Sequence, residues 1–290
     1  MMQTNTLTLG MLLMLLCGLA TTEAIAAEKE SFVYKNVGQI ALKILVSKPD
    51  DWKPTDRRPA VAFLHGGGWV GGKPGQFDEH CEHLTQRGMV CFQIQYRLLS
   101  KKKPPMPPTQ CIQDAKSAMR WIRSHADQFG IDSSRIASGG GSAGGHLAAF
   151  LGTTDGTDDP QDDLQVSARA NAMLLFNPVY NNGPNKSGLK AWGTARVGDR
   201  YEEFSPAHNI SSDDAPSIVF LGTQDNLIPT GIAQEFQANM LRENVRSDLR
   251  LYEGAGHGFF NHSKDGGKWF KLTINETDEF LVSLGWIPPR

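Results

Sequence analysis

The sequence predicts an α/β fold with a mainly parallel central sheet covered by helices on both faces. Two observations carry this prediction. Short apolar segments with strand character alternate along the chain with longer segments whose apolar residues recur at helical spacing. Such alternation is typical of strand–helix–strand units, which place helices on both sides of a parallel sheet. The length of 290 residues, the apolar content of 40% and the 30 glycines are those of an ordinary globular protein.

The expected elements begin with an antiparallel pair of strands, since residues 32–37 and 40–46 alternate or are apolar without a helical period. Gly88 ends the first helix and Thr109 begins a long one, while four prolines between residues 101 and 108 exclude a regular helix there. The remaining expected strands are 60–64, 90–96, 135–138, 171–176, 217–221 and 249–252. The expected helices are 77–87, 111–129, 143–151, 230–243 and 269–284, and the polar segment 180–206 is expected to form a lid or rim.

The N-terminus is predicted to be a signal peptide covering residues 1–26. Residues 7–20 are apolar but too short to span a bilayer, and an Ala-Ile-Ala cleavage site at 24–26 follows them. Cleavage leaves one predicted catalytic domain, residues 27–290, in a periplasmic or secreted protein without a stable membrane insertion. An uncleaved anchor is the alternative, because the first six residues contain no Lys or Arg.

Charge and cysteine content exclude several kinds of partner. A net charge of -2 and a pI near 6.4 provide no positive surface for nucleic acid or an anionic membrane. Cys81, Cys91 and Cys111 remain after cleavage, so at most one intramolecular disulfide can form. The spacing of Cys and His matches no zinc motif, and we expect no metal site. The sequence leaves the oligomeric state open.

Three segments that follow predicted strands contain the candidate chemistry. The first, Gly140-Gly141-Ser142-Ala143-Gly144, matches G-x-S-x-G between a strand and a helix of small residues. A serine on so sharp a turn takes a strained backbone, and larger neighbours would collide across it. Ser142 is therefore the candidate nucleophile. A flexible glycine loop is the alternative interpretation.

The second segment is His65-Gly66-Gly67-Gly68-Trp69. Backbone N–H groups of successive glycines can approach a tetrahedral oxyanion without obstruction by side chains. We therefore predict the amides of Gly66, Gly67 and Ala143 as oxyanion-hole donors, and His65 as a residue that bonds the loop. A plain glycine turn is the alternative.

The third segment pair supplies Asp225, in GTQDNLIP at 222–229, and His257, in the glycine-rich loop at 254–259. Each loop follows a predicted strand, and the chain order Ser, Asp, His is the one expected for a nucleophile on such an elbow. Asp213 and Asp214 precede their strand and belong at the opposite edge of the sheet. Other histidines are given structural places: His80, His83 and His125 at the surface of helices, and His146 beneath the elbow.

Taken together, HGGGW at 65–69, GGSAGGHLA at 140–148, GTQDNLIP and GHGF at 256–259 resemble the α/β-hydrolase superfamily. The resemblance is closest to esterases that include hormone-sensitive-lipase-like carboxylesterases and bacterial acetyl xylan and feruloyl esterases. It spans about residues 32–284. It implies an α/β-hydrolase fold and acyl transfer without a cofactor, with Ser142 as nucleophile, His257 as base and Asp225 as its orienting acid.

Two departures favour the carbohydrate esterases within this group. Gly141 stands where hormone-sensitive-lipase-like enzymes usually have Asp, and residues 27–59 are too few for their N-terminal cap. We therefore expect a serine esterase for short acyl groups such as acetyl, with acetylated plant polysaccharide as one substrate class. Trp69, Tyr180 and Trp192 are predicted to stack on a sugar ring, or else to form pocket walls. An arylformamidase-like amide hydrolase and a lipase for longer acyl chains are the alternatives.

Overall fold

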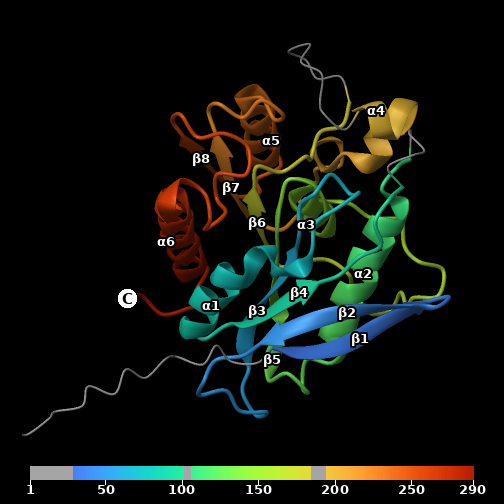
Figure 1. Cartoon of the computed structure of the whole chain (residues 1–290), viewed down its shortest axis with the longest axis vertical. Coiled ribbons are helices and arrows are strands. Elements are labelled where there is room, and N and C mark those ends of the chain that lie inside the picture. The colour runs from blue at the N-terminus through green and yellow to red at the C-terminus, as the bar shows by residue number, and fades with distance from the viewer. Residues whose placement is uncertain (1–28, 101–105, 184–193) are drawn as a thin grey trace, which may run out of the picture.

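The structure, a computed structural model, describes residues 29–100, 106–183 and 194–290. The predicted signal peptide and Trp192 lie outside these ranges. Within them, eight strands form one sheet in the order β1-β2-β4-β3-β5-β6-β7-β8 (Figure 1). The strands are β1 (Glu30–Val37), β2 (Ile40–Ser47), β3 (Arg58–Leu64), β4 (Val90–Ile94), β5 (Ile131–Gly141), β6 (Ala172–Phe176), β7 (Ser217–Gly222) and β8 (Ser247–Tyr252).

The sheet is antiparallel at one edge and parallel elsewhere. β1 pairs antiparallel with β2, and β2 pairs antiparallel with β4. Every other neighbouring pair is parallel. The predicted mainly parallel α/β architecture, with an antiparallel opening pair, is therefore confirmed.

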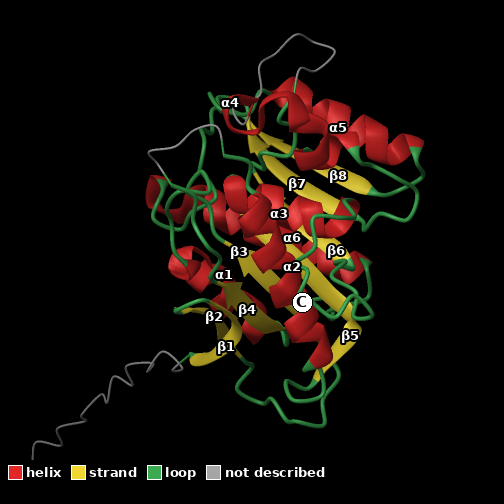
Figure 2. Ribbon diagram, turned by 90° about the vertical axis from the view of Figure 1, so that its right-hand side faces the viewer, coloured by secondary structure: helices red, strands yellow, loops and turns green. Residues whose placement is uncertain are grey.

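Helices cover both faces of the sheet, as Figure 2 shows from the side. The longer helices are α1 (Asp78–Gln86), α2 (Thr109–Ser124), α3 (Ala143–Thr153), α5 (Thr230–Arg242) and α6 (Lys268–Ser283). Short helices are α4 (Thr194–Val197) and four 3-10 turns, η1 (Pro74–Phe77), η2 (Gly198–Phe204), η3 (Pro206–His208) and η4 (Asp265–Gly267). α2, α3 and α5 pack on one face, and α1 and α6 pack on the other.

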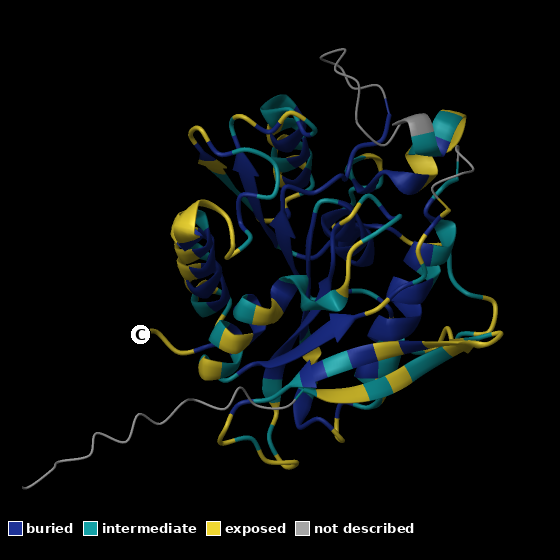
Figure 3. Cartoon of the chain, in the orientation of Figure 1, coloured by how far each residue is buried: buried dark blue, intermediate teal, exposed yellow. Residues whose placement is uncertain are grey.

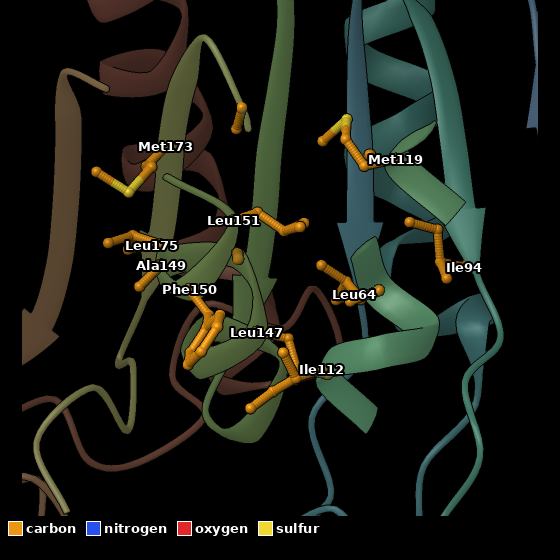
Figure 4. Packing of buried hydrophobic residues seen from close by; sticks show 14 of the residues in the cluster. Leu64, Ile94, Ile112, Met119, Leu147, Ala149, Phe150, Leu151, Met173 and Leu175 are labelled. Atoms are coloured by element: carbon orange, nitrogen blue, oxygen red, sulfur yellow. The ribbon is translucent and has the colours of Figure 1, made fainter. Parts of the chain in front are cut away.

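Strand periodicity divides the core into two apolar layers. In β3, Ala60, Ala62 and Leu64 belong to the layer under α2, α3 and α5, whereas Val61 and Phe63 belong to the layer under α1 and α6. Alternate residues of a strand point to opposite faces, so a central strand with both faces covered must be apolar throughout. The central strands are dark in Figure 3, and Figure 4 shows side chains of the first layer, among them Leu64 of β3, Ile112 of α2 and Leu147 of α3.

Several element ends differ from the prediction: β5 runs over Ile131–Gly141 instead of 135–138, and α2 and β4 both stop early. α2 stops at Ser124 instead of residue 129, and residues 125–130 form turns that end at Gly130, with a positive φ of 59°; the Phe129 carbonyl there accepts a hydrogen bond from Trp52. β4 stops at Ile94 instead of residue 96; beyond it, Gln95 Oε1 accepts the Lys43 N–H at 3.2 Å, and the Arg97 N–H donates to the Asp114 carboxylate at 2.9 Å. In both cases contacts distant in sequence hold the residues that follow the element.

The three described cysteines are buried free thiols. Cys91 lies beside Cys81, with its Sγ 3.8 Å from the Cys81 carbonyl oxygen. Cys111 lies elsewhere and donates to the Arg97 carbonyl at 3.2 Å. Of the possible pairs, only Cys81 and Cys91 are therefore neighbours. No helix in the described ranges has the length and apolar content needed to cross a bilayer.

The prediction that His80 lies at the surface is wrong. His80 is fully buried in α1, and neither ring nitrogen has a hydrogen-bond partner within the described chain. Its ring lies among five phenylalanines, at centroid distances from 4.9 to 6.0 Å: Phe63, Phe77, Phe176, Phe260 and Phe270. Loss of hydration disfavours the charged form, which lowers the pKa of His80 to about 3.

This burial predicts a specific acid sensitivity. As the pH falls below about 6.5, the unfolded chain binds a proton at His80 that the folded chain excludes, so the free energy of unfolding declines by up to about 1.4 kcal/mol per pH unit. His80→Phe removes this term and keeps an aromatic ring in the cage. Chemical denaturation between pH 7 and pH 4 is expected to show a shallower loss of stability in the variant than in the wild type.

A part of the acid sensitivity remains in this variant, because burial also lowers the pKa of His146, to about 4. His262→Phe is the control, since the side chain of His262 is 52% exposed. Parallel stability curves for wild type and His80→Phe would contradict the assignment of the acid sensitivity to His80.

Candidate active site

The candidate residues meet at one edge of the sheet because the parallel strands all end there. β3 leads into the glycine loop at 65–72, β5 into Ser142, β7 into the loop of Asp225, and β8 into the loop of His257. These strands, with β6, are consecutive in the sheet order β3-β5-β6-β7-β8. Carboxyl ends of parallel strands are where open α/β sheets bind their ligands.

Ser142 occupies a strained turn between β5 and α3. Its φ of 55° and ψ of −118° lie outside the regions that side-chain-bearing residues favour. Its N–H donates to the Phe176 carbonyl of β6 at 2.9 Å, and its carbonyl accepts from the N–H of His146 at 2.9 Å and of Val179 at 3.1 Å. The surrounding backbone therefore fixes the turn from both sides.

The His257 ring lies between Ser142 and Asp225. Its Nε2 is 2.9 Å from Ser142 Oγ, and its Nδ1 is 2.7 Å from Asp225 Oδ2. Asp225 is completely buried at its side chain, while the His257 side chain is 23% exposed. The structure thus brings the three residues singled out in the sequence into one hydrogen-bonded array that opens to solvent at the serine end.

The Asp225 carboxylate is held from its other oxygen. Oδ1 accepts the backbone N–H groups of Leu227 at 2.8 Å and Ile228 at 2.9 Å. A buried carboxylate without such donors would carry a large desolvation cost. These bonds fix the direction of the carboxylate, so Oδ2 faces His257 Nδ1 and accepts its N–H.

Two rejected alternatives occupy other places. Asp214 pairs with Arg169 at 3.0 Å, away from the array. His146 lies beneath the turn, where its Nε2 donates to the Phe204 carbonyl at 2.8 Å and its ring meets Trp69 edge-on at 5.1 Å. The expected structural role of His146 agrees with this packing.

The prediction of Gly66 as an oxyanion donor needs correction. Its N–H already donates to Gln76 Oε1 at 2.6 Å, and its carbonyl accepts from Nδ1 of the buried His65 at 2.8 Å. Gly67 and Gly68 follow at positive φ values of 120° and 62°, and their N–H groups make no hydrogen bond within the described chain. The loop therefore offers these two amides as donors in place of Gly66.

Ala143 is the first residue of α3, so its N–H has no partner within the helix. The positive end of the helix dipole adds to the attraction for a developing negative charge at this point. Gly66 and Ser142 are adjacent, since a Cβ built on Gly66 would lie 3.5 Å from the Ser142 Cβ. The glycine loop and the helix N-terminus therefore enclose the serine from two sides.

The prediction that Trp69 and Tyr180 stack on a sugar is wrong for the structure as it stands. Both rings are fully buried. Tyr180 stacks on Phe236 of α5 with centroids 4.4 Å apart, and Trp69 packs on His146. Neither ring has a free face for a ligand, so both are wall or core residues, and Trp192 lies outside the described residues.

Asn177 is a further residue of the site that the sequence motifs did not indicate. It follows β6 with a positive φ of 36°, is fully buried, and accepts the N–H of Gly258 on its Oδ1 at 2.9 Å. Asn177 therefore fixes the peptide that follows His257. An Asn-Pro pair directly after a buried strand was the available signal, since Asn tolerates a left-handed backbone there.

The described ranges contain no group of three or more His, Cys, Asp or Glu side chains arranged to bind a metal ion. The array instead combines a hydroxyl, an imidazole, a buried carboxylate and free backbone amides. These are the groups required for nucleophilic attack with proton transfer and stabilisation of an oxyanion.

Comparison with known proteins places the chain among esterases. Residues 49–240 match the BD-FAE family. Esterase LipC of Mycobacterium tuberculosis is 32% identical over 231 residues, which are 72% of this chain and 56% of that protein. Ethyl acetate hydrolase of Pseudomonas putida is 26% identical over 263 residues, 84% of this chain and 76% of that protein. The chain spans about half the length of the first curated relatives, LipC at 56% and LipM at 44%.

Solved structures of Thermogutta terrifontis esterase 2 match over nearly their whole length. Its apo form is 40% identical, with a TM-score of 0.84, and the match covers 91% of this chain and 98% of that one. The propionate-bound form has 39% identity and the same TM-score, covering 92% and 98% of the two chains. Another form is phosphoramylated by tabun, at 38% identity and a TM-score of 0.85 over 91% and 98%.

One glycine of α3 controls how the two donor segments fit together. A Cβ on Gly144 would lie 2.0 Å from the Leu64 carbonyl oxygen and 2.6 Å from that of His65, both in the backbone of the neighbouring segment. Gly144→Ala must therefore push the helix from the glycine loop, and we expect a loss of about 2–3 kcal/mol in the free energy of unfolding, measured in urea.

Gly71→Ala is the matched control, because the nearest atom to its added Cβ is 3.8 Å away. We expect its stability to stay within about 0.5 kcal/mol of the wild type. Equal stability of the two variants would show that the close approach at Gly144 does not constrain the fold.

Proposed function

Because the chain belongs to the BD-FAE family of the α/β-hydrolase superfamily, we propose that it is a serine carboxylic-ester hydrolase acting on short acyl esters. The observation that carries the proposal is the His257 ring, whose nitrogens lie 2.9 Å from Ser142 Oγ and 2.7 Å from Asp225 Oδ2. Relatives named as esterases support the same class of reaction.

The first half of the reaction forms an acyl-enzyme. Ser142 Oγ attacks the ester carbonyl carbon while His257 Nε2 takes the hydroxyl proton, and Asp225 stabilises the imidazolium. The carbonyl oxygen becomes an oxyanion facing the Gly67 and Ala143 amides. When the tetrahedral intermediate collapses, the carbon–oxygen bond to the alcohol breaks and the leaving oxygen takes the proton from His257.

The second half returns the enzyme to its starting state. Water enters the place of the alcohol, and His257 removes its proton as the oxygen attacks the acyl carbon. A second oxyanion forms in the same donors and collapses, releasing the carboxylic acid and restoring the Ser142 hydroxyl. Since charge develops twice at one place, donors held rigidly by the backbone serve both steps.

Two findings support a short acyl group. A relative that covers most of the chain is named ethyl acetate hydrolase, and related structures hold propionate and butyrate. The sequence between 180 and 206 also contains few aliphatic residues that would line a channel for a long chain. Acetyl to butyryl esters are therefore the proposed substrates.

The alcohol part of the substrate is proposed to be small. Acetylated polysaccharide has less support than the sequence indicated, because Trp69 and Tyr180 are buried. We also propose that the predicted leader at 1–26 directs export of the enzyme. Its substrates would then be esters in the periplasm or outside the cell, with a small alcohol or a polysaccharide as the alcohol part.

Replacement of the nucleophile tests the mechanism. Ser142→Ala is expected to lower kcat for p-nitrophenyl acetate by at least ~10³ while circular dichroism and Tm stay those of a folded protein. Ser138→Ala is the matched control in the same strand; its hydroxyl bonds the Ala148 carbonyl at 2.8 Å, so the variant should lose stability but keep kcat. Turnover by Ser142→Ala at the wild-type rate would contradict the assignment of Ser142 as the nucleophile.

An acyl-chain series tests the substrate class. With p-nitrophenyl esters from acetyl to dodecanoyl, kcat/KM is expected to peak between two and four carbons, since longer chains find no apolar channel. Acetylated xylan, methyl ferulate and an N-formyl aryl amide are assayed beside them. A peak at eight carbons or more would favour a lipase, and faster turnover of the formyl amide an amide hydrolase; either result contradicts the proposal.

A further inference from the structure

Two side-chain amides connect the glycine loop to the histidine loop. Gln76, in η1, accepts the Gly66 N–H on Oε1 at 2.6 Å and donates from Nε2 to Asn261 Oδ1 at 3.0 Å. Asn261 donates from Nδ2 to the Gly258 carbonyl at 2.7 Å. Gln76 and Asn261 are 185 residues apart in sequence, and the strands that precede the two loops, β3 and β8, are separated in the sheet by β5, β6 and β7.

The order of donors and acceptors permits only one orientation of these amides. The Gly66 N–H can only donate, so it requires the oxygen of Gln76, and the Gln76 nitrogen then requires the oxygen of Asn261. The Asn261 nitrogen in turn meets the Gly258 carbonyl, which can only accept. Rotation of either amide by 180° would place two donors or two acceptors together, so the chain of bonds holds both side chains in a fixed direction.

At one end, these bonds determine where the oxyanion donor points. Gly66 is held at both its N–H, by Gln76, and its carbonyl, by His65 Nδ1. The Gly66 carbonyl and the Gly67 N–H belong to the same planar trans peptide and point in opposite directions. Fixing Gly66 therefore fixes the direction of the Gly67 N–H.

At the other end, the bonds hold the peptide next to the imidazole. The Gly258 carbonyl accepts from Asn261 Nδ2 at 2.7 Å and from the Asn261 backbone N–H at 3.2 Å, and the Gly258 N–H donates to Asn177. Gly258 has a positive φ of 78°, a conformation that glycine adopts without strain, and its hydrogen bonds select this conformation among those open to glycine. The backbone next to His257 is therefore held by the Asn177 side chain and by Asn261, through its side-chain nitrogen and its backbone N–H.

We propose that Gln76 and Asn261 are a positioning pair that sets the oxyanion donors at a fixed separation from His257 Nε2. The proposal rests on the function proposed above, because both groups must reach one tetrahedral carbon on Ser142 at the same moment. In the described ranges the side-chain amides of the pair bond to Gly66, to Gly258 and to each other, and not to Ser142 Oγ or His257 Nε2. The pair acts through Gly67 and His257, so its loss should weaken stabilisation of the transition state and leave the affinity for the ester unchanged.

The test removes the hydrogen bonds while preserving side-chain size. Gln76→Met, Asn261→Leu and the double variant are assayed with p-nitrophenyl acetate. Displacement of reacting groups by about 1 Å costs up to ~10²-fold, so each single variant is expected to lower kcat by about 10- to 100-fold with little change in KM. The double variant is expected to be no slower than the worse single variant, because residues that act as a unit are not additive.

A transition-state analogue separates positioning from general destabilisation. The inhibition constant of an aryl trifluoromethyl ketone, which forms a tetrahedral adduct on the serine, is expected to rise in each variant by the factor that kcat/KM falls. Gln237→Met is the matched control, since Gln237 is half-buried in α5 and donates to the Ser247 carbonyl at 2.9 Å. It should keep wild-type kcat and inhibition.

Three results overturn the pair's role: unchanged kcat in both single variants, a loss in KM alone, or single losses that multiply in the double variant. Asn261→Leu tests the pair from the other loop if Gln76→Met does not fold. Wild-type protein that neither turns over the ester nor is labelled at Ser142 by a fluorophosphonate contradicts the proposed function itself. Labelled, active wild type with unaffected variants contradicts only the positioning pair.

Discussion

The strained backbone of Ser142 is held in place by three other segments: the end of β6 with the residues after it, the first turns of α3, and the end of β3. Phe176 accepts its N–H, Val179 and His146 donate to its carbonyl, and Gly144 brings α3 against the Leu64 carbonyl with no space for a side chain. These contacts are made between main chains, which relax far less than side chains do. The serine, the helix N-terminus and the glycine loop are therefore one rigid unit, and the positions of the other site residues follow from it.

The ionisable side chains buried around this unit are either uncharged or hydrogen-bonded. Asp225 is buried with every nearby donor in place, whereas His65, His80 and His146 are kept uncharged by burial, which lowers their pKa values. None of these four buried groups is therefore an unbonded charge, and their surroundings have a low dielectric constant. Such surroundings strengthen the attraction between backbone donors and an oxyanion, which is the term that contributes most in sites of this kind.

The sequence predicted what depends on local constraints. The sheet, the placement of Ser142, Asp225 and His257 after strands, and the resemblance to α/β-hydrolase esterases all follow from motifs next to strand ends, and the fold and the resemblance are confirmed. The errors concern contacts across the fold. Occupation of the Gly66 N–H depends on Gln76, and burial of Tyr180 depends on Phe236. His80 is the exception. It is spaced three residues from Phe77 and four from Leu84, on one apolar stripe of a helix, so the sequence alone could have predicted its burial.

The side chain of Asn261 also bears on how the protein is produced. Asn261-His262-Ser263 is an acceptor sequence for N-linked glycans, which attach to the same nitrogen that donates to Gly258. That nitrogen lies in a half-buried space between two loops, and a branched sugar there would force them apart. A yeast or insect secretion host that modifies this asparagine would deliver a folded protein with a displaced histidine loop, whereas a bacterial host without this modification would not.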